Sequence, residues 1–491
     1  MVKSLLRSGL LPTFEILLFL LVFWASLVFM PDMLNSDGDL GRHITVGNYI
    51  LDTRSIPARD VFSDTRYDAP LVLHEWLSEV VFALAYRAAG LNGVAWLTAL
   101  LLATIYFVLA VGLRALGVSA PLAFLAALAA YLTGMIHQLP RPHLFSLLLF
   151  TFLLILLERY RRNSRLSVLV FVLPIMILWA NLNGAFVLAF FVLGIYSIGA
   201  LLERKARRAA IFLALLGVSF AASFVNPYGV QLPFYVFGFM GNRFLVDNTV
   251  EYLSPNFHNI SAWMFAAWIL FSIVLLGRGT TRVSWTHLLV LGAWTAFGLY
   301  SARNIANYAQ VAALVTAPVA ELWLVNILPP ARARLENFTR IAPLGAGWLW
   351  AIGVVALLIS LQANGTRLDA RGSGNVFTEP TFPVNAVNFL ERNLPQGKVF
   401  NEYTWGGYLE FRLFPSVRVF IDGNNDFFGE ALVREYLDII NARDGWQENL
   451  ARYDVRWVIV PPERAIAKEL ARSAEWQEIY RDKSAVIWVK R

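Results

Sequence analysis

A short acidic segment at residues 35–43 carries the side chains best suited to chemistry in this sequence. It reads Asn-Ser-Asp-Gly-Asp-Leu-Gly-Arg-His, so two carboxylates, Asp37 and Asp39, stand close to a cation and an imidazole. The segment follows the first strongly apolar run of the chain. Carboxylates at the edge of a bilayer could act as a general base on a substrate carried by lipid. A structural alternative exists, because Ser36 and Asp39 also fit a capping box, in which side chains close the start of a helix.

Later loops of the chain carry polar groups of the same kinds. The alternation of apolar runs predicts that these loops reach the same face of the membrane as the acidic segment. Acid, histidine and arginine gathered at one interface suit a phosphate-bearing substrate, because they can deprotonate a nucleophile and stabilise a leaving group. Each group taken alone is more often a headgroup contact, a turn residue or a helix cap. The loops contain His137–His143, Asn181–Gly184, Asn226–Gly229 followed by Asp247, Glu251 and His258, and Ser301–Asn304.

The composition is that of an integral membrane protein. Of 491 residues, 57% are hydrophobic and 15% are charged, and the mean hydropathy is +0.56. A helix needs about 20 mostly apolar residues to cross the hydrocarbon layer, and such runs predict a polytopic α-helical membrane protein with about 11 transmembrane helices. The first run is too long for a cleaved signal peptide and lacks a cleavage site. The expected spans lie near 14–31, 92–113, 119–136, 143–158, 166–181, 184–202, 209–225, 259–277, 284–300, 304–327 and 342–361.

Basic residues fall in alternate loops, which sets the expected orientation because Lys and Arg of short loops stay in the cytoplasm. The N-terminus is therefore predicted to be cytoplasmic, and the first long loop and the chain beyond residue 362 exoplasmic. We expect a multi-pass protein of the plasma membrane. Its net charge of +7 suits anionic lipid headgroups of the bilayer rather than nucleic acid. The basic set is Lys3, Arg7, Arg114, Arg159, Arg161, Arg162, Arg165, Arg204, Lys205, Arg207, Arg208, Arg278, Arg282, Arg332, Arg334 and Arg340.

The sequence predicts two domains. Residues 1–362 form the transmembrane domain with its first exoplasmic loop at 32–91, and a linker at 363–375 leads to an exoplasmic domain at 376–491. Helix-like stretches alternate there with short apolar runs, which predicts an α/β domain with a mostly parallel sheet. The chain has no cysteine, which excludes disulfides and thiolate metal sites. The expected helices are 383–393, 428–440 and 463–473, and the expected strands are 397–400, 417–421, 455–460 and 485–489.

The first loop is expected to hold an amphipathic helix. Apolar residues between Leu40 and Leu51 recur at helical spacing and would lay one face along the membrane interface. Asp39, Arg42 and His43 share the opposite face.

A non-catalytic membrane protein is the alternative interpretation, as a transporter, a lipid-linked glycan carrier or an assembly partner. Transporters carry ionisable groups or broken helices near the middle of the bilayer. The expected spans contain few of either, mainly Glu321, His287, Pro174 and Pro318. The polar groups are instead predicted to gather at one rim of the membrane domain.

Short motifs spread over nearly the whole chain form a consistent set. They are Asp37–His43, Gly47, Ile56-Pro57, Asp60, Phe62-Ser63, His74–Leu77, Arg141-Pro142-His143, Trp179–Gly184, Asn226–Gly229 and Ala302–Asn304. This set resembles bacterial polytopic membrane proteins of the glycosyltransferase-C superfamily. The tail is similar to the start of the exoplasmic domain of oligosaccharyltransferase catalytic subunits, through Ala386–Leu390, Asn401–Tyr408 and Asp422–Asn425.

The resemblance implies an enzyme that passes a sugar from a polyprenyl-phosphate-linked donor to an exoplasmic glycan, lipid or protein acceptor, usually with inversion at the anomeric carbon. It also implies an acidic base in the first exoplasmic loop, which matches Asp39 first and Asp37 second. His43, one turn from Asp39, would orient it. Cationic groups would compensate the charge of the departing lipid phosphate. The expected substrate-binding residues are Arg141, His143, Arg303, Glu251 and His74.

Metal use differs among such relatives. Asp37 and Asp39, with the distant Glu251, could supply oxygen ligands for Mg²⁺ or Mn²⁺, and a metal-free base fits the same residues. The tail departs from its relatives, since Glu402–Gly407 stands where they have WWDYG, and recognition of a protein glycosylation sequon is therefore not implied. We expect Trp405–Tyr408 to pack the tail onto the membrane domain, and Asp422–Asn425 to form a turn.

Overall fold

The computed structural model describes residues 11–278, 283–327 and 347–491. Several predictions fall outside these ranges. They concern the start of the span at 342–361 and the basic residues Lys3, Arg7, Arg282, Arg332, Arg334 and Arg340.

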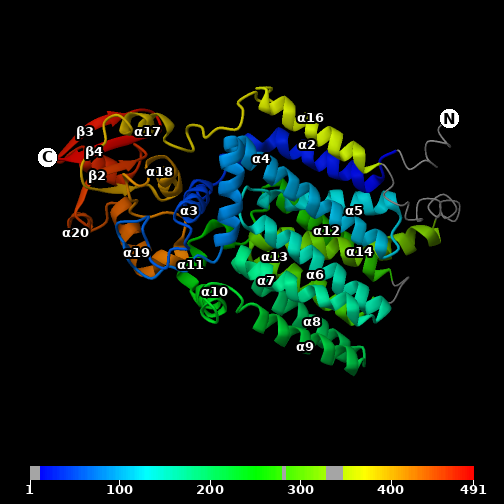
Figure 1. Cartoon of the computed structure of the whole chain (residues 1–491). Coiled ribbons are helices and arrows are strands. Elements are labelled where there is room, and N and C mark those ends of the chain that lie inside the picture. Colours follow the sequence, from blue (N-terminus) through cyan, green and yellow to red (C-terminus); the bar gives the residue numbers. More distant parts are fainter. Residues whose placement is uncertain (1–10, 279–282, 328–346) are drawn as a thin grey trace.

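A bundle of apolar helices makes up most of the described chain (Figure 1). Seven of its helical segments are long and apolar enough to cross a membrane, so a total of about 11 spans stays a prediction. Outward side chains such as Leu270 and Ile273 are 63% and 61% exposed, which suits a lipid environment. The bundle comprises α2 (Phe14–Leu34), α4 (Trp76–Ala115), α5 (Ala120–Thr133) with η1 (Gly134–His137), α6 (His143–Asn163), η2 (Leu166–Phe171) with α7 (Val172–Leu182), η3 (Gly184–Val187) with α8 (Leu188–Leu202), α9 (Ala206–Ala222), α12 (Ile260–Gly277), α13 (Trp285–Tyr300), α14 (Ile305–Ile327) and α16 (Trp348–Ala363).

The predicted basic loops meet at one end of this bundle. Arg162, at the end of α6, donates to the backbone oxygen of Leu116 that follows α4. Arg161 donates to Ser284 before α13 over 2.8 Å. At the opposite end lie the first loop and the C-terminal domain, which we name the exoplasmic domain after its predicted location (Figure 1). The two ends therefore separate as the charge pattern indicates, and the assignment of one end to the cytoplasm stays a prediction.

The first loop forms α3 (Leu40–Thr53), which packs between α4 and the exoplasmic domain. Its helical character agrees with the spacing, but its apolar face is covered by protein rather than lying along the lipid interface, since Leu40 and Ile44 are fully buried. Glycines permit this close packing. A side chain at Gly41 would overlap the backbone oxygen of Gly407, and one at Gly47 would overlap the backbone of α4.

The exoplasmic domain is built on a four-stranded sheet in the order β1-β2-β4-β3. β1 pairs with β2 in parallel, while the β2–β4 and β4–β3 pairs are antiparallel. The prediction of a mostly parallel sheet is therefore wrong. The strands are β1 (Lys398–Asn401), β2 (Val455–Val460), β3 (Trp476–Arg481) and β4 (Val486–Lys490), and the helices are α17 (Val384–Leu390), η6 (Tyr403–Trp405), α18 (Gly406–Leu413), α19 (Asn425–Ile440), α20 (Trp446–Arg452) and α21 (Ala465–Leu470).

The strand expected at 417–421 is not part of this sheet. Val419 makes a single parallel bridge to Ser63 of the first loop instead. Its backbone N–H donates to Phe62 O over 3.1 Å, and its carbonyl oxygen accepts from Asp64 N over 2.9 Å. This segment thus ties the exoplasmic domain to the first loop.

Candidate active site

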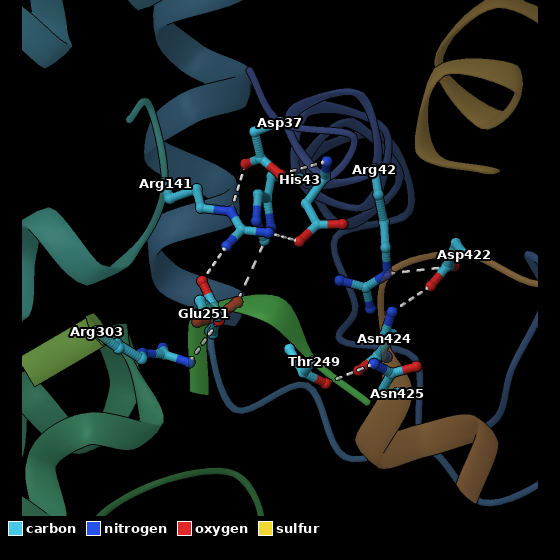
Figure 2. Close-up of polar contacts among 12 residues, drawn as sticks. Asp37, Arg42, His43, Arg141, Thr249, Glu251, Arg303, Asp422, Asn424 and Asn425 are labelled. Carbon is cyan, nitrogen blue, oxygen red and sulfur yellow. Dashed lines mark hydrogen bonds and ion pairs between the residues drawn. The ribbon is translucent and has the colours of Figure 1, made fainter. Parts of the chain in front are cut away.

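The acidic segment of the first loop places its two aspartates against Arg141. The acidic segment turns between the end of α2 and the start of α3, and Asp39 occupies the N-cap position of α3 without making a capping hydrogen bond. Ser36 donates to the backbone oxygen of Asp32, so the capping-box interpretation is wrong. Both aspartates instead contact the guanidinium of Arg141, and Figure 2 shows Asp37 at this contact.

Arg141 lies in the turn between η1 and α6, flanked by Pro140 and Pro142. Proline fixes the backbone torsion φ on both sides, which limits where this side chain can point. The side chain is 20% exposed, so its charge is held mostly inside protein. Buried charges of this kind require partners, and Arg141 has carboxylates on every side.

A third carboxylate comes from the long loop that follows α9. This loop contains α10 (Gln231–Gly241), α11 (Arg243–Asp247) and η4 (Val250–Tyr252). Glu251 lies 2.9 Å from Arg141 Nη1 and, through its other oxygen, 2.9 Å from Arg303 Nη1. Arg303, on η5 (Ala302–Asn304), also donates to the Tyr252 hydroxyl over 2.6 Å. Glu251 therefore joins the two arginines predicted to bind phosphate.

Burial sets the charge states of this cluster. It raises the pKa of Asp37 to about 6, although the nearby Arg141 opposes the shift. Burial would also raise the pKa of Glu251, but Arg303 and Arg141 outweigh it and hold that pKa below its usual range. Glu251 is thus ionised at neutral pH, while Asp37 gains a proton in mildly acidic conditions.

A second ionic group lies between α3, α4 and the exoplasmic domain. Arg42 Nη1 is 3.1 Å from Glu79 Oε1, and Arg42 Nε is 3.5 Å from Asp422 Oδ2. His43 Nδ1 lies 3.3 Å from the same Glu79 oxygen. We expected His43 to orient Asp39, but its imidazole pairs with Glu79 instead. Burial lowers the pKa of His43, but Glu79 and Glu75 outweigh it and raise that pKa above its ordinary value.

Two other predicted residues lie outside the Arg141 cluster. His74 Nδ1 is 3.4 Å from Asp426 Oδ2 in the exoplasmic domain, so His74 joins the two domains. His143 Nε2 lies at hydrogen-bond distance from the backbone oxygen of His137, so this nitrogen already has a partner within the protein. The structure thus brings together Asp37, Asp39, Arg141, Glu251 and Arg303 among the eight predicted site residues, and their chemical roles stay predictions.

The exoplasmic domain closes over the acidic segment. Asp39 Oδ1 lies directly against Gly423, where any side chain would overlap the carboxylate. Asp422 accepts from the backbone N–H of Asn424 over 2.6 Å, and it also pairs with Arg42. The chain bends at Gly423, but the expected turn is shorter than predicted because α19 already begins at Asn425. Sequence reasoning missed this ionic role of Asp422, although the Asp-Gly-Asn-Asn signal was visible. It also assigned no role to Glu79, which is 1% exposed and has an oxygen without a hydrogen bond in the described chain.

One group of residues has the geometry to hold a metal ion. Ligand atoms of His43, Glu75 and Glu79 lie within 4.8 Å of one another. Arg42 already contacts Glu79 over 3.1 Å, so a cation there would share its ligands with a guanidinium.

Solved structures of an oligosaccharyltransferase from Archaeoglobus fulgidus match almost the whole chain. The apo form superposes with a TM-score of 0.59 at 11% identity, covering 91% of this chain and 70% of that one. Its complex with an inhibitory peptide and a dolichol-phosphate gives a TM-score of 0.58 at 12% identity, over 90% of this chain and 69% of that one. This chain is similar in fold to an archaeal oligosaccharyltransferase.

The structural match confirms, at the level of fold, the resemblance that the motifs indicated. A further structure of the archaeal enzyme, in complex with Zn and sulfate, matches with a TM-score of 0.51 at 13% identity, over 90% of this chain and 67% of that one. No protein-family model and no curated protein matches the sequence.

Proposed function

We propose that this protein is a membrane glycosyltransferase that moves a sugar from a polyprenyl-phosphate-linked donor to an exoplasmic acceptor with inversion. The observation that carries the proposal is the direct contact of Asp39 with Arg141 at the junction of the membrane and exoplasmic domains. A carboxylate and a guanidinium so placed can serve an attacking hydroxyl and a departing phosphate in one step. Support comes from the archaeal neighbour, which was solved with a dolichol-phosphate.

Asp39 is the stronger candidate for the base. Its side chain is 22% exposed, against 6% for Asp37, so an acceptor hydroxyl can reach it more readily. In the proposed step the acceptor oxygen attacks the anomeric carbon while its proton moves to Asp39. The bond from that carbon to the phosphate oxygen breaks, and the lipid phosphate leaves with the electron pair. Arg141 and Arg303 compensate the charge that develops on it.

The acceptor is proposed to approach beside the exoplasmic domain, near Gly423. The Trp405–Tyr408 segment is an unsuitable contact for it, because Trp405 and Tyr408 are 3% and 1% exposed and the indole of Trp405 donates to Thr381 O. Both rings belong to the apolar core of the exoplasmic domain itself, so they do not pack the tail onto the membrane domain as expected. Within this segment Gly407 is the residue that lies against the first loop. A protein sequon is therefore not favoured over a glycan or lipid acceptor.

Complementation of a deletion strain tests the proposal. Asp39→Asn should abolish the glycan product that the wild type restores, and Asp39→Glu should retain part of the activity. Asp32→Asn is the matched control, because Asp32 is exposed and its contact is with Arg371. Full restoration of the glycan profile by both Asp39→Asn and Asp37→Asn would overturn the catalytic role. Lipid flipping in proteoliposomes without sugar transfer would favour the carrier alternative.

A further inference from the structure

The guanidinium of Arg141 is surrounded by carboxylates on each of its three nitrogens (Figure 2). Nε contacts Asp37, Nη2 contacts Asp39 and Nη1 lies 2.9 Å from Glu251. The three carboxylates come from two loops that are more than 200 residues apart in sequence. They therefore meet only in the folded chain. Their shared feature is a single cation at the centre.

Three convergent carboxylates are also the ligand set that a hard divalent ion prefers. The sequence indeed suggested Asp37, Asp39 and Glu251 as ligands of Mg²⁺ or Mn²⁺. In the folded chain this set does not fit a metal ion, because each carboxylate already directs an oxygen at the guanidinium. A second positive charge, Arg303, shares Glu251 and would further oppose an added cation.

We infer that Arg141 is the resident cation of this centre and takes the place among the three carboxylates that a divalent ion would otherwise need. The inference rests on the proposed glycosyl transfer, and it means that this reaction needs no metal ion. Arginine suits this role because its charge is permanent and its planar donors hold several oxygens in fixed directions. The flanking prolines restrict the backbone that carries this cation.

The arrangement also couples proton transfer to phosphate binding. Each nitrogen of the guanidinium faces a carboxylate, so its charge is already shared among three anions before a leaving group arrives. When Asp39 takes the acceptor's proton it becomes neutral, and its pairing with Arg141 Nη2 weakens. That nitrogen can then donate to the lipid phosphate as the bond to the sugar breaks and negative charge develops there.

The second acidic cluster also has an arginine beside its carboxylates. Ligand atoms of His43, Glu75 and Glu79 lie close enough to bind a metal ion, but Arg42 already contacts Glu79. Each of the two acidic clusters thus contacts an arginine, which is Arg141 in the first cluster and Arg42 in the second.

Direct binding of Mn²⁺ tests the inference without any substrate. The full-length chain in lipid nanodiscs, stripped with EDTA, is titrated with Mn²⁺ and followed by electron paramagnetic resonance. The wild type should show no stoichiometric site. Arg141→Ala should create one, and the added change Asp37→Asn should remove it again. Arg371→Ala is the control, because it removes an arginine whose carboxylate partner lies outside the site.

Several outcomes would overturn the inference. One is stoichiometric Mn²⁺ binding by the wild type that Asp37→Asn abolishes. Another is wild-type binding that Glu75→Gln abolishes, since this would place the ion in the second acidic cluster. If Arg141→Ala fails to fold, Arg141→Lys and the wild-type titration still decide the question. Sugar transfer by the wild type should change less than about twofold with EDTA, and a complete lack of transfer would count against the proposed function alone.

Discussion

Asp37 should lose its proton near pH 6 in the folded protein. Burial is the largest cause and raises its pKa from 3.8 to about 6 against the opposing effect of Arg141. A shift of roughly two units corresponds to about 3 kcal/mol, which folding must supply to keep this carboxyl ionised. Since the pKa is higher in the folded state than in the unfolded state, the stabilising contribution of this group is present at low pH. It is lost as the pH rises through 6.

The comparison of wild type with Asp37→Asn isolates this contribution, because asparagine matches the shape of the neutral acid and cannot ionise. Melting curves in nanodiscs between pH 4 and 7 should show the stability of the wild type, relative to the variant, falling by up to about 3 kcal/mol, or a few degrees. Asp32→Asn is the control, because its carboxylate is 51% exposed and should give no such trend.

Two results would refute the reasoning on Asp37. A stability difference that is constant over this pH range would mean that the carboxyl has an ordinary pKa. A difference that grows in favour of the wild type as the pH rises toward 4 from below would mean that Arg141 outweighs burial and holds the pKa of Asp37 below its ordinary value. Sugar transfer offers an independent check, since the rate should fall below pH 6 in the wild type and this acid limb should be missing in the variant.

Three substitutions test how the two domains are held together. Gly407→Ala should cost about 1–3 kcal/mol of stability by overpacking, because the methyl group would lie 2.5 Å from a backbone oxygen of the first loop. The control is Gly217→Ala, whose methyl group enters open space and should leave the melting temperature unchanged or higher. Arg42→Met should cost about 3–5 kcal/mol because it leaves buried carboxylates unpaired, whereas Arg371→Met breaks an exposed pair worth at most about 1 kcal/mol; equal melting temperatures would contradict the inferred burial. Gly423→Ala should displace the carboxylate of Asp39 and slow sugar transfer about 10- to 100-fold, with a small effect on melting; an unchanged rate would place the acceptor elsewhere.

Much of the fold could be predicted because membrane spans leave a strong local signal. Long apolar runs place the helices, and the basic loops separate the two ends. The sheet was harder to predict. β3 (Trp476–Arg481) is an edge strand with two charged residues, Glu478 and Arg481, so its apolar signal is weak. The run at 417–421 looks like a strand, but the first loop takes its hydrogen bonds.

The candidate site was predictable as a list of side chains and less so as a set of contacts. Sidedness placed Arg141 and Glu251 on one face, yet they are 110 residues apart and no local pattern shows that they meet. The pairing of His43 with Glu79 was hidden for the same reason. The backbone of α4 is not helical at Ala89 and Gly90, just before the predicted second span, and the helical segment that precedes this break carries Glu79 to the site.

The glycine contacts between the first loop and the tail have a consequence for protein engineering. Gly41 and Gly407 each leave room for the backbone of the other segment, and Gly423 leaves room for Asp39. The tail is consequently not an interchangeable module, although a linker joins it to the membrane domain. A chimera that imports a foreign tail to change the acceptor should misplace the base unless the matching first loop is exchanged with it. We therefore expect the tail and the position of the proposed base to be inherited as one unit.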